Sequence, residues 1–327
     1  MQQLRDRLEQ RQIAIYFAAV AVATLIALAL PGAAAPDALE WLVNPALALM
    51  LFVTFLQVPL AELGRAFAQG RFIGALLVTN FIVIPLLLAT LLPLAPDQPL
   101  VQLGVLLVLL APCIDYVVTF AHLGRADARL LLAATPVLLL AQMALLPLYL
   151  RLLLGDAAAA AVQPGPFIDA FTWLIAAPLA LAALVQFAAG RVGAAARANA
   201  ALGLLPVPAT ALVLFIVVAS TLPQLGQSRA AALGVLPLYL AFALLAPLAG
   251  WLVARLFRLA APAGRAVAFS GATRNSLVVL PLALAVPGAV PLLPAVIVTQ
   301  TLVELLAELV YVRVIARFGS AARQAGA

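Results

Sequence analysis

Apolar segments of about twenty residues recur along the whole chain and limit its fold more than any other feature. A helix of roughly 20 residues crosses the hydrocarbon core of a bilayer, which is about 30 Å thick. Only 9% of the 327 residues are charged and 66% are hydrophobic, whereas about a quarter of the residues of a soluble domain are charged. The chain is therefore predicted to be an all-α membrane protein. Ten transmembrane helices are expected, near residues 13–31, 41–60, 72–94, 100–122, 130–153, 168–188, 202–222, 231–253, 266–286 and 291–312.

The short loops between these segments leave no room for a soluble catalytic domain. The chain has no glycine-rich phosphate loop, HExxH, CxxC or serine-hydrolase motif. Its single cysteine allows no intrachain disulfide and cannot build a closed metal cage. We therefore expect neither an enzyme nor a protein with a cofactor or a tightly bound metal. The first apolar segment is too long for the core of a cleaved signal peptide and is expected to be a membrane helix.

The arginines predict which side of the membrane each loop occupies. All eighteen basic residues are Arg. With a cytoplasmic N-terminus, fifteen of them lie in or beside cytoplasmic segments, Arg151 and Arg229 lie outside, and Arg274 lies within a span. This bias follows the positive-inside rule. Both termini are therefore expected in the cytoplasm, with the protein in the cell (inner) membrane. The net charge of +6 then reflects topology and not nucleic-acid binding.

The two halves of the chain match each other at an offset of 163 residues. Residues 45–52 (PALALMLF) align with residues 208–215 (PATALVLF), and six of the eight positions are identical. Because five spans are an odd number, the second half would enter the membrane from the opposite side. Residues 1–160 and 161–327 are thus predicted to be two inverted five-helix repeats, an arrangement typical of secondary transporters. The alternative is a duplicated bundle whose helix breaks are only structural.

Polar residues interrupt the fourth and ninth predicted spans at matching places. The interruptions are residues 112–115 (PCID) and residues 273–276 (TRNS), and the offset of 163 superimposes them without a gap. Proline removes a helical hydrogen bond, and an ionisable side chain at membrane depth costs several kcal/mol. We therefore predict that helices 4 and 9 are broken, that they cross, and that the breaks form a binding site.

Asp115 and Arg274 are predicted to lie at similar depth in the inner half of the bilayer, because their spans run in opposite directions. An ion pair between them, direct or through an anion or water, would offset two desolvation costs. Asp115 is thus a candidate proton-coupling residue, and Arg274 would hold it ionised or attract an anion. The alternative for Asp115 is a purely structural salt bridge.

Cys113 follows a proline and precedes Asp115 by two residues within the first break. A buried cysteine is most often a small hydrophobic residue. A thiolate, however, is a good ligand for soft, thiophilic elements, and a single soft contact in an open cavity suits transient binding. Cys113 is therefore a candidate substrate ligand.

Uncharged polar side chains near the breaks are the other candidate ligands. Asn275 and Ser276, together with Thr273 and Ser270, offer amide and hydroxyl groups to a substrate or ion. Asn44 directly precedes a proline in the matched segment and is expected to face a cavity. Most other intramembrane amides are expected to form interhelical hydrogen bonds of roughly 1 kcal/mol each; they are Gln57, Asn80, Gln142 and Gln300.

Glu304 and Glu308 are four residues apart in the tenth span and share a helix face. Glu308 is near the cytoplasmic end of the span, so we expect it to be solvated at the interface. Glu304 is deeper. A structural polar role is favoured for it, with a place on a proton path as the alternative.

The ten spans, the two inverted halves and the paired breaks resemble the bile acid:sodium symporter superfamily. Residues 110–113 (LAPC) and 116–118 (YVV) are similar to its arsenite permease branch. That resemblance implies a functionally important cysteine at Cys113 and arsenite export in exchange for protons. Sodium-coupled members, in contrast, carry a glutamate and a glutamine where this chain has Ser270 and Arg274. Coupling to protons, or to nothing, is therefore implied instead of coupling to sodium.

One further departure concerns the arsenite permeases themselves. They tend to carry an acidic residue just after the ninth-helix asparagine, where this chain has Leu277 and Val278. The hypothesis is that Asp115 on the facing helix supplies this carboxylate.

The sequence as a whole predicts an efflux permease, a proton antiporter for arsenite or antimonite. The alternative is an organic-anion symporter, in which Arg274 would bind the substrate carboxylate. A receptor or channel has less support, because the chain has no soluble sensor segment and no ring of like charges of the kind used in channel filters.

Overall fold

The computed structural model describes residues 2–29, 36–57, 69–113, 116–161, 172–221, 225–284, 286–289 and 292–319. These residues form helices and turns, with no strand and a single isolated antiparallel bridge among them. The all-α prediction is thereby confirmed for the described part of the chain.

Within the described residues, four helical segments are long and apolar enough to cross a membrane. They are Gly70–Leu94, Val137–Gly155, Ser228–Leu256 and Leu292–Arg317. A fifth would be the pair Gly193–Leu202 and Pro206–Ser220, which is bent by 44°. The chain is thus a multi-pass membrane protein, but the predicted count of ten spans is not confirmed.

Helix breaks explain part of the difference. The predicted span 100–122 is divided into α6 (Pro99–Leu109) and α7 (Val117–Leu123). The predicted span 266–286 is divided into α14 (Ala261–Ala272) and α15 (Ser276–Leu284). At about 1.5 Å per residue, none of these pieces is long enough to cross the hydrocarbon core alone.

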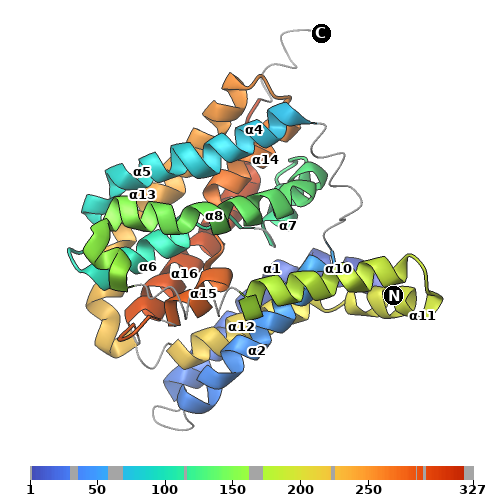
Figure 1. Cartoon of the computed structure of the whole chain (residues 1–327), viewed down its shortest axis with the longest axis horizontal. Coiled ribbons are helices and arrows are strands. Elements are labelled where there is room, and N and C mark those ends of the chain that lie inside the picture. Colours follow the sequence, from blue (N-terminus) through green and yellow to red (C-terminus); the bar gives the residue numbers. More distant parts are fainter. Residues whose placement is uncertain are drawn as a thin grey trace. The chain divides into compact units, whose positions relative to one another are not determined.

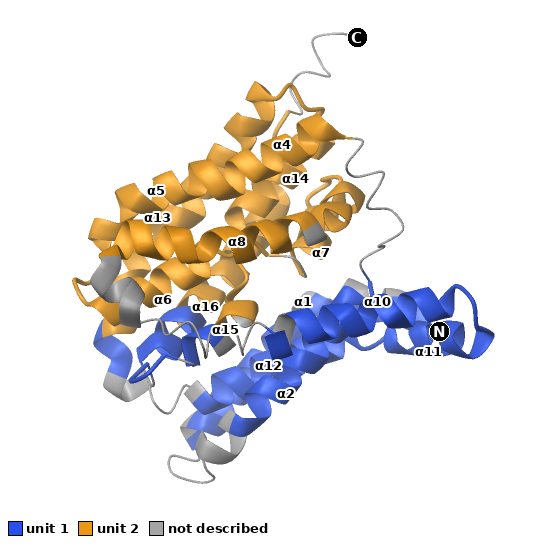
Figure 2. Ribbon diagram, in the orientation of Figure 1, with its two compact units in different colours: residues 1–58, 162–230, 280–298 blue, residues 59–161, 231–279, 299–327 orange. Residues whose placement is uncertain are grey.

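The chain forms two compact units, which are coloured separately in Figure 2. Unit 1 comprises residues 1–58, 162–230 and 280–298, and unit 2 comprises residues 59–161, 231–279 and 299–327. Each unit therefore takes segments from both halves of the sequence. The predicted boundary at residue 160 separates two internal repeats of the sequence, which are different from these compact units. The two repeats therefore remain a prediction.

Unit 1 is a helical bundle built around α12 (Figure 1). α12 packs against α1 and α2, and α10 packs against α2 and α11. The Gln186 amide of α10 donates to the carbonyl oxygens of Phe55 (3.0 Å) and Leu56 (3.2 Å) and so caps the C-terminal end of α2. The helices of unit 1 are α1 (Gln2–Ala29), α2 (Pro36–Phe55), η4 (Thr172–Ala176), α10 (Ala177–Ala189), α11 (Gly193–Leu202) and α12 (Pro206–Thr221).

Unit 2 surrounds the short helix α14, which contacts α4, η2, α7, α8 and η6. Every residue from Ala266 to Ala272 is buried, as expected of a helix that is apolar on all sides. The remaining elements of unit 2 are α4 (Gly70–Val78), η2 (Thr79–Val83), α5 (Ile84–Leu91), η3 (Leu92–Leu94), α8 (Ala128–Ala161), most of α13 (Leu225–Leu256), most of α16 (Leu292–Val314) and η6 (Ile315–Arg317).

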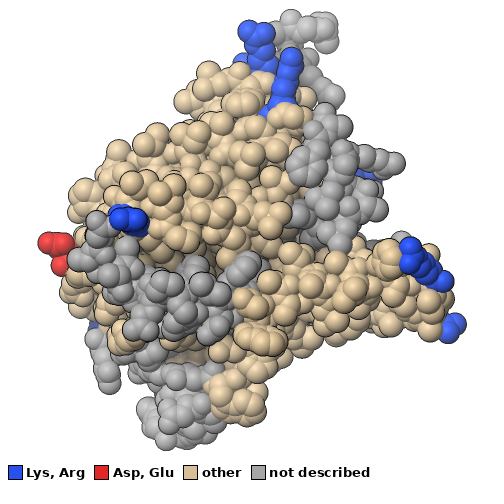
Figure 3. Space-filling model, viewed as in Figure 1, with Lys and Arg blue, Asp and Glu red and all other residues tan. Residues whose placement is uncertain are grey.

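The surface of unit 2 fits a lipid environment. On the face shown in Figure 3, its charged side chains lie near the margins, and the described surface between them is uncharged. Large apolar side chains are exposed on its long helices, for example Leu140 (63%) on α8 and Leu244 (71%) on α13. A broad uncharged surface of this kind is expected where helices face lipid.

Glycine allows α13 and α14 to approach closely. A Cβ atom at Gly250 would lie 2.9 Å from Ala268 Cα and 2.9 Å from the Val267 carbonyl oxygen. Small residues at such contacts are how membrane helices gain packing energy. Because both obstructing atoms belong to the backbone, Gly250→Ala is expected to lower the free energy of unfolding by about 1–3 kcal/mol.

Thermal unfolding of the purified protein in detergent checks this expectation. Gly70→Ala is the control, because a Cβ atom at Gly70 meets nothing within 4 Å. Equal unfolding temperatures for the two variants would contradict the close contact between α13 and α14.

Candidate functional site

The two helix breaks of unit 2 lie directly against each other. Pro112 and Arg274 form an antiparallel bridge. The Cys113 N–H donates to the Thr273 carbonyl oxygen (3.1 Å), and the Asn275 N–H donates to the Ala111 carbonyl oxygen (2.7 Å). Unwound backbone at membrane depth is tolerated only where other protein groups satisfy it. Each break therefore supplies the hydrogen bonds that the other lacks.

Helix ends converge on the place where residues 111–113 of the first break meet residues 273–275 of the second. We call this place the crossing. α6 ends at Leu109, α14 ends at Ala272, and α15 begins at Ser276. Asn275 caps α15, because its side-chain oxygen accepts from the Val278 N–H (3.1 Å), as an N-cap residue does. The crossing is thus framed by the negative ends of two helix dipoles and the positive end of a third.

Arg274 is fully buried at the centre of the crossing, with 0% of its surface exposed. Its guanidinium donates to four oxygen atoms: the Leu109 carbonyl (3.4 Å), the Gly271 carbonyl (2.7 Å), the Ser270 carbonyl and Asn80 Oδ1 (2.9 Å). The three carbonyl groups belong to the last turns of α6 and α14. A cation in this position satisfies their orphan oxygens and is favoured by both helix dipoles.

Asn80 reaches Arg274 from η2, a single π-helical turn. Its amide nitrogen donates to Ser270 Oγ (2.9 Å) and to the Leu76 carbonyl oxygen (3.0 Å), so the whole amide is engaged. Pro85 lacks the N–H that would bond to the Phe81 carbonyl, and the Tyr149 hydroxyl of α8 donates to that carbonyl instead. Single π-turns are frequent at functional sites.

Glu304 of α16 is buried and accepts three hydrogen bonds. They come from the Tyr116 hydroxyl (2.5 Å), the Arg274 backbone N–H (2.7 Å) and the Gln300 amide (2.5 Å). Donors of this kind stabilise an ionised carboxylate. Glu304 therefore fixes the backbone of the second break and is joined to the segment before α7 through Tyr116.

Glu308 lies one helical turn further along α16 and is also fully buried, with 0% exposed. The expectation of a solvated interfacial position was wrong. Thr273 and Glu308 contact each other through Thr273 Oγ1 and Glu308 Oε1, 2.5 Å apart. Thr273 follows the last residue of α14 at the break, and its hydroxyl contacts Glu308. The position of Glu308 along its predicted span does not reveal this contact.

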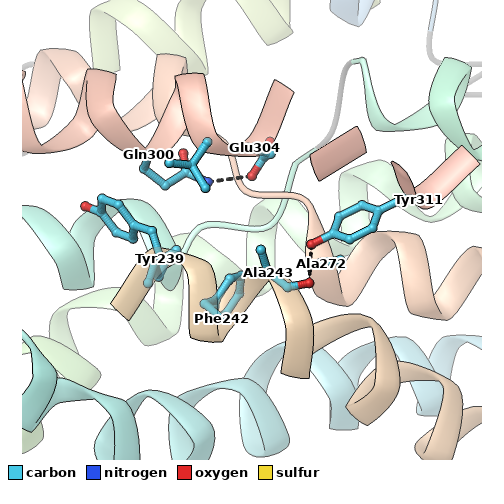
Figure 4. Close-up of a pocket in the computed structure, with 9 residues that line it drawn as sticks. Tyr239, Phe242, Ala243, Ala272, Gln300, Glu304 and Tyr311 are labelled. Atoms are coloured by element: carbon cyan, nitrogen blue, oxygen red, sulfur yellow. Dashed lines mark hydrogen bonds between the residues drawn. The ribbon is translucent and has the colours of Figure 1, made fainter. Parts of the chain in front are cut away.

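A small pocket opens beside Glu304, between α13 and α16. It is lined by Tyr239, Phe242, Gln300, Glu304 and Tyr311, among others, and Figure 4 shows the hydrogen bond from Gln300 to Glu304 at its edge. The pocket has room for about one water molecule. In this conformation the crossing is therefore closed to anything larger from that side.

The structure brings several of the predicted site residues together. Cys113, Arg274, Asn275, Ser276 and Glu304 all lie in unit 2 at the crossing, and each has at most 3% of its surface exposed. Cys113 is not one of the residues that line the pocket. The Ser276 hydroxyl accepts from Thr301 Oγ1 (2.8 Å).

The other two predicted residues are not part of this cluster. Asn44 lies on α2 of unit 1 with an exposed side chain. Asp115 falls outside the described residues, so its pairing with Arg274 remains a prediction. Among the described residues, the guanidinium of Arg274 is held by carbonyl and amide oxygens.

Three residues at the crossing were not predicted to belong to the site. Asn80 was expected to form an interhelical hydrogen bond and does so, but as a ligand of Arg274. Tyr116 bonds to Glu304, and Glu308 bonds to Thr273. The only sequence signal for Asn80 is Pro85 five residues later, which marks an irregular helix without naming the partner.

Comparison with known proteins identifies the family of the chain. No curated protein sequence matches the chain significantly. Residues 44–228, more than half of the chain, match the family described as Sodium Bile acid symporter family. This region includes the first break, and members of the family are membrane transporters and not enzymes. The chain therefore belongs to the sodium/bile acid symporter family and is a multi-pass membrane transporter.

Proposed function

We propose that this transporter exports arsenite or a related trivalent metalloid across the cell (inner) membrane, with both termini in the cytoplasm. The observation that carries the proposal is the position of Cys113. The only thiol of the chain is buried on the unwound segment of the crossing, and its backbone N–H binds the opposite break. A thiol ligates thiophilic elements, and uncharged arsenite requires no buried counter-charge.

The contacts of Arg274 favour a neutral substrate over an organic anion. Both terminal nitrogens of the guanidinium already donate to protein oxygens. A substrate carboxylate would have to displace these buried oxygens, each of which would then lack a donor at a cost of about 1–3 kcal/mol. The organic-anion alternative therefore receives no support from this geometry.

The same contacts support coupling to protons instead of sodium. The carbonyl oxygens at the ends of α6 and α14 are the kind of ligand that a hard cation prefers, but a side-chain cation already binds them. Buried carboxylates lie next to it on α16. Glu304, and Asp115 from the sequence, are the proposed proton-linked groups, and the closed crossing is one state of an alternating-access cycle between inverted repeats.

Transport by Cys113→Ser tests the thiol. In proteoliposomes, arsenite flux of this variant is expected to fall about tenfold or more, because losing a soft contact of about 1.4 kcal/mol changes binding tenfold. The variant keeps the side-chain volume and the main-chain bond of residue 113, so its unfolding temperature should remain close to that of the wild type.

The same vesicles identify the substrate class and the coupling ion. Arsenite, antimonite and small carboxylates are compared under a pH gradient and under a sodium gradient, with protein-free vesicles as the control. Undiminished arsenite flux in Cys113→Ser, or flux of carboxylates alone, would refute the metalloid proposal.

A further inference from the structure

The hydrogen bonds around Glu308, the second buried carboxylate, do not fit an ionised side chain. Thr273 Oγ1 lies 2.5 Å from Glu308 Oε1 and 2.8 Å from the Phe269 carbonyl oxygen. A hydroxyl group has a single hydrogen to donate. If Glu308 were ionised, Thr273 would face two acceptors and could serve only one of them.

The other oxygen of Glu308, Oε2, is buried and receives no hydrogen bond in the part of the chain that the structure describes. The nearby Tyr311 hydroxyl donates to the Ala243 carbonyl oxygen instead (2.5 Å), as Figure 4 shows. An ionised Glu308 would thus bury a negative charge with at most one donor among the described residues, and a buried charge with so few donors is costly.

Charge balance leads to the same conclusion. Glu304, four residues earlier on the same face of α16, has three donors and lies near the positive charge of Arg274. A second ionised carboxylate would leave the described part of this cluster with a net buried negative charge. The titratable and charged groups that act on Glu308 or on the neighbouring Tyr311 are Glu304 on α16 and Arg274 in the second break.

We propose that Glu308 is a proton-binding site: in the closed crossing it is a neutral carboxylic acid that donates to Thr273 Oγ1, while Glu304 is ionised. Thr273 then donates its own hydrogen to the Phe269 carbonyl, and both short contacts are satisfied. When the second break moves and water reaches Glu308, the proton passes from its carboxyl group to that water. This step deepens the proposed function, because it supplies the proton that metalloid export would exchange.

Infrared spectroscopy of the protein in lipid tests the site without any transport. The wild type is expected to show, at neutral pH, the C=O stretching band of a protonated carboxylic acid. Glu308→Gln should abolish this band. Thr273→Val, which has nearly the same shape, should shift it to higher wavenumber, because the acid loses its acceptor. Asp97→Asn, at an exposed position, is the control and should leave the band unchanged.

A wild-type spectrum without the band at neutral pH, or a band that persists in Glu308→Gln, would overturn the site. Should Glu308→Gln fail to fold, the Thr273→Val shift decides the same point.

Transport tests the coupling separately. Proteoliposomes of the wild type are expected to move protons in exchange for arsenite, whereas Glu308→Gln is expected to move fewer protons for each arsenite carried. An unchanged number of protons moved for each arsenite in this variant would remove Glu308 from the coupling. If the wild type carries no metalloid, the proposed function fails, and the infrared result still decides whether Glu308 holds a proton.

Discussion

Replacing Arg274 with methionine is expected to lower the free energy of unfolding by about 3–5 kcal/mol, the range for breaking a buried charged network. Methionine fills much of the same volume but donates nothing. Asn80 Oδ1 and the carbonyl oxygens of Leu109, Ser270 and Gly271 would each lose a donor. Thermal unfolding in lipid or detergent measures the loss, and transport is expected to be abolished with it.

Two further measurements make this prediction specific. Arg274→Lys should recover only part of the stability, because an ammonium group lacks the planar fork that spans the four oxygens. In Arg274→Ala, added guanidinium ion, at concentrations too low to denature the protein, should raise the unfolding temperature, whereas it should not do so in the wild type. An Arg274→Met protein as stable as the wild type would show that the guanidinium does not organise the crossing.

The second large effect is expected for Glu304→Gln. The amide places N–H donors where three donors already converge, so some of the hydrogen bonds from Tyr116, Gln300 and the Arg274 backbone are lost. Each hydrogen bond to a charged group contributes about 1.5–3 kcal/mol. The variant should therefore be strongly destabilised and inactive.

Glu308→Gln is the matched control for this variant. Its amide can donate to Thr273 Oγ1 in place of the carboxylic acid, so its unfolding temperature should fall much less than that of Glu304→Gln. Equal losses in the two variants would contradict the assignment of an ionised Glu304 beside a neutral Glu308.

The helix breaks could be predicted from the sequence because their causes are local. Pro112 ends α6 by its own chemistry, and a charged residue such as Arg274 within an apolar span marks a buried polar site. The offset of 163 residues also predicted that the two breaks correspond, and α6 and α14 indeed end 163 residues apart, at Leu109 and Ala272.

The partners of the buried charges could not be predicted in the same way. Arg274 was assigned to Asp115 on depth alone, whereas the described contacts join it to Asn80 and to carbonyl groups that carry no sequence signature. Glu308 was placed in solvent because depth along a span does not show which helix covers it. The predicted count of ten spans is not confirmed in the described part of the chain, where two of the predicted spans are each divided into two shorter helices.

The bridge between the two breaks consists entirely of main-chain atoms, and this has an evolutionary consequence. Side chains at residues 113 and 275 can change without removing the bonds from the Cys113 and Asn275 N–H groups, whereas proline, which lacks an N–H, would remove them. The scaffold can thus exchange the thiol at residue 113 for another small side chain while these main-chain bonds persist. Substrate and ion chemistry are in this way free to diverge among descendants that keep the same transport architecture.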